Sequence, residues 1–331
     1  MADYKHKFTE ITEKDWIFDD KWDEAIKFFI NVHTKQMAVF KRNYGAGCGC
    51  ETFRHYGELI AYRASLIMGI RACKVELAKI SRHTRTECFD YGCISYYGTQ
   101  EDEKFANAET IMKEYEPKTL ENILLGIESY AKSIGIEDKE KIQNLKQEFI
   151  DMMVFDCALG NHDRGLNNWM LLINKSHTDI HIYPMFDNET ILMFDIDKKT
   201  FEKYYNNLKR SQIVVFPKSK QKIEVPDPKE TVEGFLQNVE TAIILDNSKK
   251  RGTFSELLSY LAEHYPNETK KSIKKVKKFT QKDLIEVMNQ CEGLDSRMKE
   301  IALRAYEIRM QNIFSVDKYL KESTHIIEPR I

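Results

Sequence analysis

The feature of this sequence that most constrains its fold is a change in hydrophobic periodicity after residue 97. Between residues 27 and 97 the apolar side chains come mostly in short runs separated by polar turns, which is typical of β-strands. Beyond that point they recur at the spacing of helices. The sequence therefore predicts an α+β fold, with a small sheet-rich unit over residues 1–98 and a larger, mainly helical unit over residues 99–331.

Individual elements can be placed within these two units. Residues 27–32 and 37–40 flank a polar turn and predict a β-hairpin, and further strands are expected at 75–77 and 92–96. One helix interrupts this region at 57–68, with Gly69 as its C-cap. In the second unit a long helix is predicted over 139–159, followed by short strands at 169–173 and 180–185 and by several helices from 229 onward.

Charge and composition exclude several classes of protein. The chain has 50 Lys and Arg against 52 Asp and Glu, so it has no global positive field for nucleic acid or an anionic membrane. No window has the roughly 18 consecutive apolar residues that a membrane-spanning helix needs. The first 13 residues are highly charged and contain no signal-peptide pattern. We therefore expect a folded cytoplasmic protein without a membrane span and without direct nucleic-acid binding.

The cysteines favour reduced thiols over a disulfide framework. There are seven, an odd number, and most are isolated in the sequence. Cys48 and Cys50, with His55, suggest a zinc site, but no fourth ligand follows at the spacing of a zinc finger. We favour the alternative that these cysteines are small residues of a loop.

The side chains best suited to catalysis are concentrated in residues 160–168 and 185–189. Phosphoryl transfer from ATP needs a carboxylate beside the attacking hydroxyl and oxygen ligands for Mg²⁺. Asp163 is the candidate base, and Asn168 and Asp187 are the candidate metal ligands. Because Asn, Asp and Gly are also turn residues, the alternative is a polar loop with no catalytic function.

A second signal lies upstream of this motif. Lys41 ends a predicted strand and Glu58 opens the next helix, and an ion pair of this kind positions the α- and β-phosphates in kinases. Lys41 alone is more often a solvated strand end. Its combination with the downstream Asp163, Asn168 and Asp187, in this order, favours one shared nucleotide site.

These residues resemble a known family. Residues 155–164, followed by Asn168 and Trp169, are similar to the catalytic segment of HipA-like serine/threonine kinases. The segments 40–41, 57–58, 74–78 and 186–188 are also similar in type and order. By its length the chain looks like the compact, CtkA-type members. The Asp-Arg…Asn core is similar to phosphoinositide kinases as well. The motif therefore indicates phosphoryl transfer more clearly than it indicates which molecule accepts the phosphate.

The resemblance implies a two-lobed protein-kinase-like fold and Mg²⁺-dependent transfer of the γ-phosphate of ATP to Ser or Thr of a protein, with autophosphorylation. The residues implied for nucleotide binding are Lys41, Glu58, Tyr96 at the hinge, and His162. It also implies an antitoxin or regulatory partner, or a secreted effector role. The alternatives are a kinase of a lipid headgroup or small molecule, and a pseudokinase that binds nucleotide and acts as an interaction module.

Two features depart from the family pattern. The His that usually follows two residues after the catalytic Asp is replaced by Gly165, with His162 as a candidate substitute. No Gly-rich loop precedes Lys41, because the Gly run at 45–49 follows it. Backbone amides near residues 33–35, or the chain before Lys27, are the candidates for phosphate contact.

Asp156 lies on the apolar stripe of its helix, seven residues after Phe149. A carboxylate there is costly unless it is paired. We expect it to pair with Arg164 or with backbone amides of the catalytic loop, in a supporting role that Asn161 shares.

Seven Lys residues lie between positions 270 and 282, interrupted by Ile273, Val276 and Phe279. This spacing predicts one amphipathic helix with a solvated basic face, and a docking surface for an anionic partner is the alternative.

Overall fold

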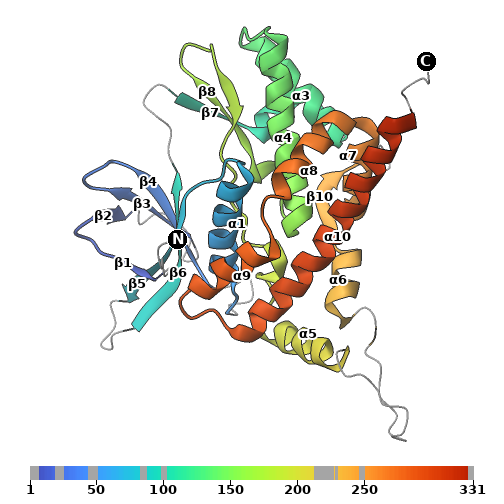
Figure 1. Cartoon of the computed structure of the whole chain (residues 1–331). Coiled ribbons are helices and arrows are strands. Elements are labelled where there is room, and N and C mark those ends of the chain that lie inside the picture. The colour runs from blue at the N-terminus through green and yellow to red at the C-terminus, as the bar shows by residue number, and fades with distance from the viewer. Residues whose placement is uncertain are drawn as a thin grey trace, which may run out of the picture.

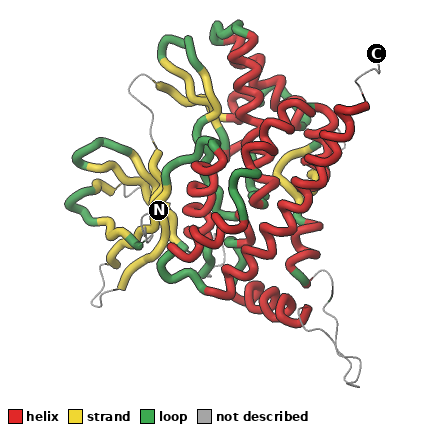
Figure 2. Tube along the Cα trace, in the orientation of Figure 1, coloured by secondary structure: helices red, strands yellow, loops and turns green. Residues whose placement is uncertain are grey.

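A twisted sheet and a larger helical part lie side by side in the computed structural model (Figure 1). Figure 2 shows the same division by secondary structure, with most of the strands gathered on the N-terminal side. The structure describes residues 7–18, 26–43, 51–82, 88–97, 103–211, 227, 230–245 and 250–326. The α+β layout that the sequence predicts is therefore confirmed.

The first sheet has six strands in the order β1-β5-β6-β4-β3-β2. Their bounds are β1 (Thr9–Ile11), β2 (Trp16–Phe18), β3 (Ile26–Asn31), β4 (Met37–Arg42), β5 (Val75–Arg82) and β6 (Cys88–Tyr97). The predicted hairpin is confirmed, because β3 pairs antiparallel with β4. Strand β1 pairs parallel with β5. Since neighbouring residues of a strand point to opposite faces, Ala38 and Phe40 join a small core within the sheet while Lys41 points to the other face.

Helix α1 (Arg54–Met68) lies between this sheet and the helical part (Figure 1). It starts three residues before the predicted start and ends at the predicted C-cap, Gly69, whose φ of 70° is left-handed. At Gly57 a Cβ atom would lie 2.8 Å from the carbonyl oxygen of Glu189. A glycine at this position therefore lets α1 approach the segment after Asp187 closely.

The second part contains two small sheets and most of the helices. Strands β7 (Glu103–Asn107), β8 (Met170–Asn174) and β9 (Ile180–Ile182) form one sheet, and β10 (Glu240–Ile244) and β11 (Arg251–Thr253) form the other. The helices are α2 (Ala108–Ile111), α3 (Leu120–Ser133), α4 (Lys139–Leu159), α5 (Lys198–Ser211), α6 (Val232–Asn238), α7 (Phe254–His264), α8 (Pro266–Val276), α9 (Gln281–Gln290) and α10 (Ser296–Ile326). Two short 3₁₀ turns are also present: η1 (Leu166–Asn168) ends the first candidate catalytic segment, and η2 (Ile191–Met193) follows the second.

Helix α4 is the central element of this part, and its bounds agree with the prediction. The predicted apolar stripe, from Ile142 through Phe149 to Met153, is buried. Its buried face belongs to one core that runs from α1, β5 and β6 through α4 to α10. Because this core continues across residue 98, the division into units 1–98 and 99–331 stays a prediction.

The basic run does not form one helix. Helix α8 ends at Val276, and the buried Phe279 lies in the connection to α9. Two of the lysines are paired, Lys275 with Asp151 at 2.5 Å and Lys277 with Asp317 at 2.7 Å. The predicted amphipathic helix is present as α8, which buries Ile273 and Val276, but its extension to Phe279 was wrong because the chain turns at residues 277–280.

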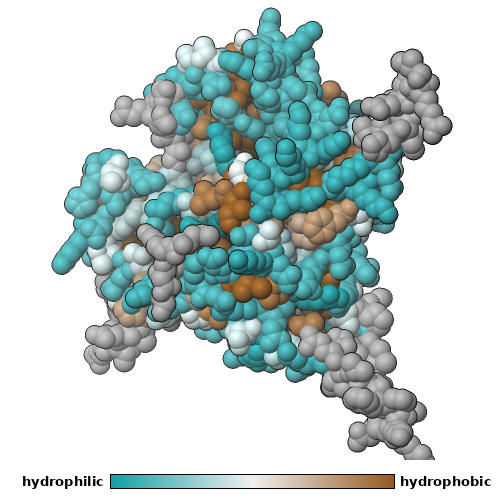
Figure 3. Space-filling model, viewed as in Figure 1, coloured by the Kyte–Doolittle hydropathy of each residue, from teal (hydrophilic) through white to brown (hydrophobic). Residues whose placement is uncertain are grey.

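The outer surface is mostly hydrophilic on the face shown in Figure 3, with hydrophobic side chains visible near its middle. Among the described helices, none is long and apolar enough to cross a membrane.

Candidate active site

Lys41 is the centre of the first group of site residues. Its Nζ lies 2.5 Å from Oε1 of Glu58 on α1 and 2.5 Å from Oδ1 of Asp187. Glu58 is only 1% exposed. Burial disfavours the charge of Lys41, but Glu58 and Asp187 outweigh burial and raise its pKa well above the usual value. The lysine–glutamate pair predicted from strand and helix is therefore formed, with a second carboxylate from a distant segment.

Backbone geometry brings the strands together at Lys41. A Cβ atom on Gly92 of β6 would lie 2.0 Å from the carbonyl oxygen of Lys41. Only glycine permits this approach of β6 to β4.

The segment that carries Asp187 is held against α1 and the start of β5. The backbone of Met185 exchanges hydrogen bonds with Arg71 and Cys73, and the amide of Asn188 donates to Oε2 of Glu58 at 3.1 Å. Asp187 has a φ of 56°, which is uncommon for a non-glycine residue. Burial raises its pKa, but Lys41 and Arg164 outweigh burial and hold the pKa below the usual value. Asp187 is therefore ionised.

The catalytic-loop candidates follow the end of α4. The helix stops at Gly160, whose φ is 80°. The side-chain amide of Asn168 donates to the Asp163 carbonyl oxygen at 2.5 Å and reaches Oδ2 of Asp163 at 3.4 Å. Asp163 is exposed, whereas Asn168 is buried. The loop thus presents one reachable carboxylate beside a fixed amide.

Arg164 joins the two segments. Its Nε and Nη2 donate to the two oxygens of Asp156 at 2.9 and 3.1 Å. Nη1 donates to the carbonyl oxygens of Asn168 at 2.9 Å and Phe186 at 2.6 Å, and Nη2 also donates to Oδ1 of Asn188 at 2.5 Å. A guanidinium has five N–H groups, so all of them have acceptors. This buried network fixes the Asp163 loop relative to the Asp187 segment.

The other two predicted loop residues face Thr190 and Asp195. Oδ1 of Asn161 accepts a hydrogen bond of 2.6 Å from the Thr190 hydroxyl. Nε2 of His162 lies 3.6 Å from Oδ2 of Asp195. Burial raises the pKa of Asp195, while His162 opposes this shift. His162 thus has a carboxylate partner that the sequence pattern did not identify.

Two further charged residues at the site were missed in the sequence. Glu189 offers an oxygen within 4.8 Å of the oxygens of Glu58 and Asp187, and it forms an ion pair with Arg54 of α1. Burial raises the pKa of Glu189 to about 7. Its position two residues after Asp187 was a usable signal. Arg54 had none, because its partner is 135 residues away.

Tyr96 does not point toward this site. Lys41 is paired with Cys93 in the sheet, so alternation along β6 places Tyr97, not Tyr96, on the face of Lys41. The Tyr96 hydroxyl donates to Glu76, and its amide donates to the carbonyl oxygen of Lys74. The hinge role expected for Tyr96 concerns adenine bonding to the backbone, which side-chain direction does not test, so it stays a prediction.

Other expectations fall partly outside the described residues. Cys48, Cys50 and the chain at 19–25 lie there, and so does the Gly run. The amides of His33 and Thr34 donate to Oδ1 of Asn31, so the turn itself uses them. Among the described cysteines, Cys73, Cys93, Cys157 and Cys291 are free and buried.

No known protein family and no curated protein matches this sequence. Solved structures do match its fold. The proinflammatory kinase CtkA of Helicobacter pylori superposes with a TM-score of 0.67 over 96% of this chain and 100% of its own, at 15% identity. HipA, from the HipA, HipB and operator DNA complex of Shewanella oneidensis, gives a TM-score of 0.50 over 93% of this chain and 64% of its own, at 11% identity. The chain has the two-lobed fold of these kinases, as the resemblance predicted.

Proposed function

We propose that this protein is a kinase that transfers the γ-phosphate of ATP to Ser or Thr of a protein, with autophosphorylation. The observation that carries the proposal is the position of the Lys41 ammonium, 2.5 Å from both Glu58 and Asp187. Arg164 connects this group to the loop that holds Asp163 and Asn168. Lysine, two acidic groups and an amide in one network are the parts that phosphoryl transfer requires.

The donor set fits Mg²⁺ and a nucleotide. Asp187 is held ionised, and the nearby acidic side chains provide oxygen ligands of the kind that hard cations prefer. Asp187 and Asn168 would hold the metal, which neutralises phosphate charge when bound. Lys41, kept cationic by its two carboxylates, would bind the phosphates. The roles of His162 and of Glu189 next to this set are part of the same proposal.

Asp163 is proposed to accept the proton of the attacking hydroxyl. Its exposure makes it reachable by a hydroxyl on a macromolecule. Asn168 holds the loop backbone at Asp163 and so fixes the direction of the carboxylate. Asp156 and Asn161 act indirectly, through Arg164 and Thr190.

The names of the similar structures support kinase activity and a protein partner, whereas the protein acceptor is proposed from the family resemblance alone. CtkA is described as a kinase, and HipA was solved with HipB. We extend both features to this chain as proposals, with a cytoplasmic location. If the acceptor is instead a lipid or a small molecule, the labelled product would be found in the lipid or metabolite fraction.

One observation favours the pseudokinase as a second candidate. Gly165 stands where the family has His, and no side chain can contact phosphate from that position. A Cβ atom there would meet only Oδ1 of Asn167, at 2.9 Å, which is the end of a flexible side chain. Gly165→His therefore fits the loop and is a direct test of whether the missing imidazole limits the rate.

The proposal is tested with γ-labelled ATP, Mg²⁺ and the full chain. Label is expected on the protein itself or on a generic protein substrate, as phosphoserine or phosphothreonine. Mg·ATP should also raise the melting temperature of wild type. In Asp187→Ala, the part of this increase that depends on Mg²⁺ should be lost. A thermal shift without any transfer would favour the pseudokinase, and the absence of both would overturn nucleotide binding itself.

A further inference from the structure

The Asp187 segment, residues 187–195, has an unusual backbone. Three of its non-glycine residues are left-handed, with φ values of 56° at Asp187, 49° at Leu192 and 66° at Met193. This conformation is uncommon outside glycine and costs free energy, so it persists only where surrounding contacts hold it. The contacts of this segment therefore decide whether Asp187 stays in its place beside Lys41.

The first turn of α1 supplies one set of these contacts. The amide of Phe53, just before the helix, donates to the carbonyl oxygen of Phe194 at 3.0 Å. The guanidinium of Arg54 forms an ion pair with Glu189, and the two side chains are only 22% and 18% exposed. Exposed surface pairs contribute little to stability, but a pair shielded to this extent leaves an uncompensated charge when one partner is removed.

The catalytic loop supplies the second set. The Thr190 hydroxyl donates to Asn161 at 2.6 Å and accepts from the amide of His162 at 3.3 Å. The His162 side chain lies 3.6 Å from Asp195 at the end of the segment. Burial raises the pKa of Asp195, while the charges of His162 and Arg54 oppose this shift. The charge of Arg54 thus acts on both Glu189 and Asp195, six positions apart.

The segment obtains its negative charge from carboxylates. In many kinases the corresponding loop is ordered when a phosphorylated residue pairs with arginine. The hydroxyl available between positions 187 and 195 is that of Thr190, which is 5% exposed and already bonded to Asn161. Glu189 and Asp195 occupy the place of such a phosphate beside Arg54.

We propose that Arg54 is a positioning residue, which acts through Glu189 and Asp195 to hold Asp187 in its metal-binding position. The two carboxylates replace a phosphate group, so the protein is active without prior phosphorylation. This inference rests on the proposed kinase function, because Asp187 is the metal ligand only in that function.

Arg54→Met tests the role of the charge. The amides of Asn188 and Phe194, which donate to Glu58 and to the carbonyl oxygen of Ile191, should exchange with solvent deuterium faster than in wild type, even without metal. In the labelled-ATP assay, the Mg²⁺ concentration for half-maximal rate should rise about 10–100-fold, the usual effect of losing a group that orients a metal ligand. Arg54→Lys, which keeps the charge, should recover most of both properties.

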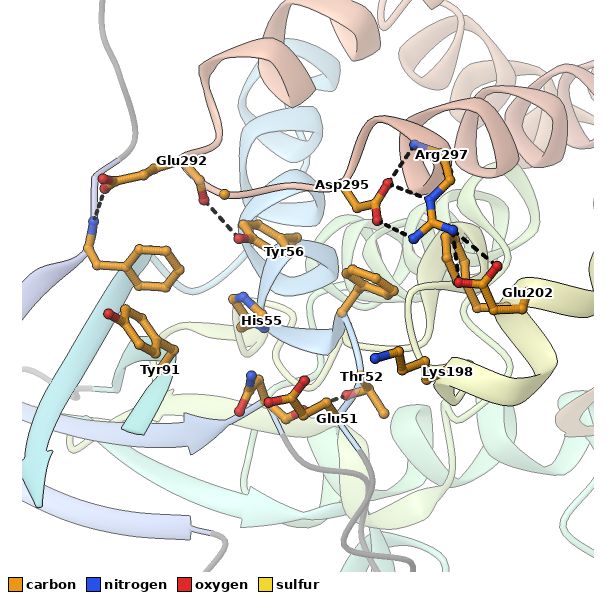
Figure 4. Close-up of a pocket in the computed structure, with 15 residues that line it drawn as sticks. Glu51, Thr52, His55, Tyr56, Tyr91, Lys198, Glu202, Glu292, Asp295 and Arg297 are labelled. Atoms are coloured by element: carbon orange, nitrogen blue, oxygen red, sulfur yellow. Dashed lines mark hydrogen bonds and ion pairs between the residues drawn. The ribbon is translucent and has the colours of Figure 1, made fainter. Parts of the chain in front are cut away.

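Arg297→Met is the matched control. Arg297 also pairs with carboxylates, donating to Glu202 at 2.8 Å and to Asp295 at 2.9 Å, but it joins α5 to the start of α10 (Figure 4). Its loss should leave amide exchange in the Asp187 segment and the Mg²⁺ requirement unchanged. Equal effects of Arg54→Met and Arg297→Met, or of Arg54→Met and Arg54→Lys, would overturn the proposal.

The independence from phosphorylation is tested on wild type that has been treated with a protein phosphatase. Transfer to a generic protein substrate should begin at the full rate, without a lag. A lag that prior incubation with Mg·ATP removes would overturn this part of the proposal. If wild type transfers no phosphate before or after the treatment, the kinase proposal fails, and amide exchange in Arg54→Met still decides whether Arg54 holds the segment.

Discussion

Arg164 in the candidate active site and His55 at the start of α1 are both buried, but the chain supplies them with hydrogen bonds to very different extents. In the active site Arg164 is 2% exposed and all five of its N–H groups have acceptors. His55 is almost equally buried, yet its Nδ1 has no partner in the described part of the chain. His55 and Glu58 lie three positions apart on α1, so their side chains are neighbours on one side of the helix.

The difference indicates where each region obtains its polar partners. A complete internal network recovers the cost of desolvating its charges and fixes the relative positions of distant segments. A buried polar atom without a partner keeps that cost in the folded state. The Arg164 network is thus preorganised by the chain itself, whereas Nδ1 of His55, like Nδ2 of Asn161 and Oδ1 of Asp195 near the catalytic loop, has no partner among the described residues.

The largest expected effect comes from the one active-site residue that is exposed. Asp163→Asn should lower the rate of phosphoryl transfer by about 10²–10⁴, because the carboxylate acts mainly in the transition state. Binding of Mg·ATP, measured by thermal shift, should stay nearly unchanged. An Asp163→Asn variant that transfers phosphate at the wild-type rate would remove Asp163 as the base.

A second substitution breaks the closed network itself. Asp156→Ala leaves the buried guanidinium of Arg164 without its carboxylate and should lower the free energy of unfolding by about 3 kcal/mol. The transfer rate should fall as well, since Arg164 then holds Asn168 and Phe186 less firmly. Chemical denaturation and the labelled-ATP assay measure the two effects.

Asp151→Ala is the matched control, on the same helix. Asp151 is also buried and paired, with Lys275, but it contacts no residue of the active site. Its removal should cost stability and leave the transfer rate per folded molecule unchanged. Equal loss of rate in both variants would mean that Asp156 acts only through stability.

The smallest expected effect concerns the unpartnered imidazole. His55 has a pKa of about 3 in the folded protein, compared with its ordinary value of 6.5. The unfolded chain therefore gains a proton first as the pH falls, so the stability from neutral His55 is complete above 6.5 and is lost progressively toward 3. Between neutral pH and about pH 5, the free energy of unfolding of wild type should fall by roughly 2 kcal/mol more than that of His55→Phe.

Urea unfolding of the two proteins at both pH values measures this difference. Identical pH dependence of wild type and His55→Phe would show that His55 has a partner or a solvent path.

Local sequence was sufficient for the elements that depend on periodicity. The β3–β4 hairpin, the C-cap at Gly69 and the bounds of α4 follow from short-range spacing and from the backbone freedom of glycine. The order of Lys41, Glu58, Asp163, Asn168 and Asp187 was also visible. The structure brings Lys41 together with Glu58 and Asp187, and Asp163 together with Asn168.

The direction of side chains near the ends of helices and strands was harder to predict from the sequence. The hinge position of Tyr96 did not determine which neighbouring tyrosine faces Lys41, and the pairing of Lys41 with Cys93 places Tyr97 on that face. The basic run was read as one helix because Ile273, Val276 and Phe279 keep helical spacing, although the chain turns after Val276.

The sequence by itself determined the two-part layout and the chemical types available at the site, because both depend on residues close together in the chain. Only the tertiary structure decided which charges are paired. Arg54 meets Glu189 across 135 positions, and Asp156 is satisfied by Arg164 while His55 is left without a bond to Nδ1. Such pairings depend on how α1, α4 and the Asp187 segment pack against one another, and no local pattern records the distance between two segments that folding brings together.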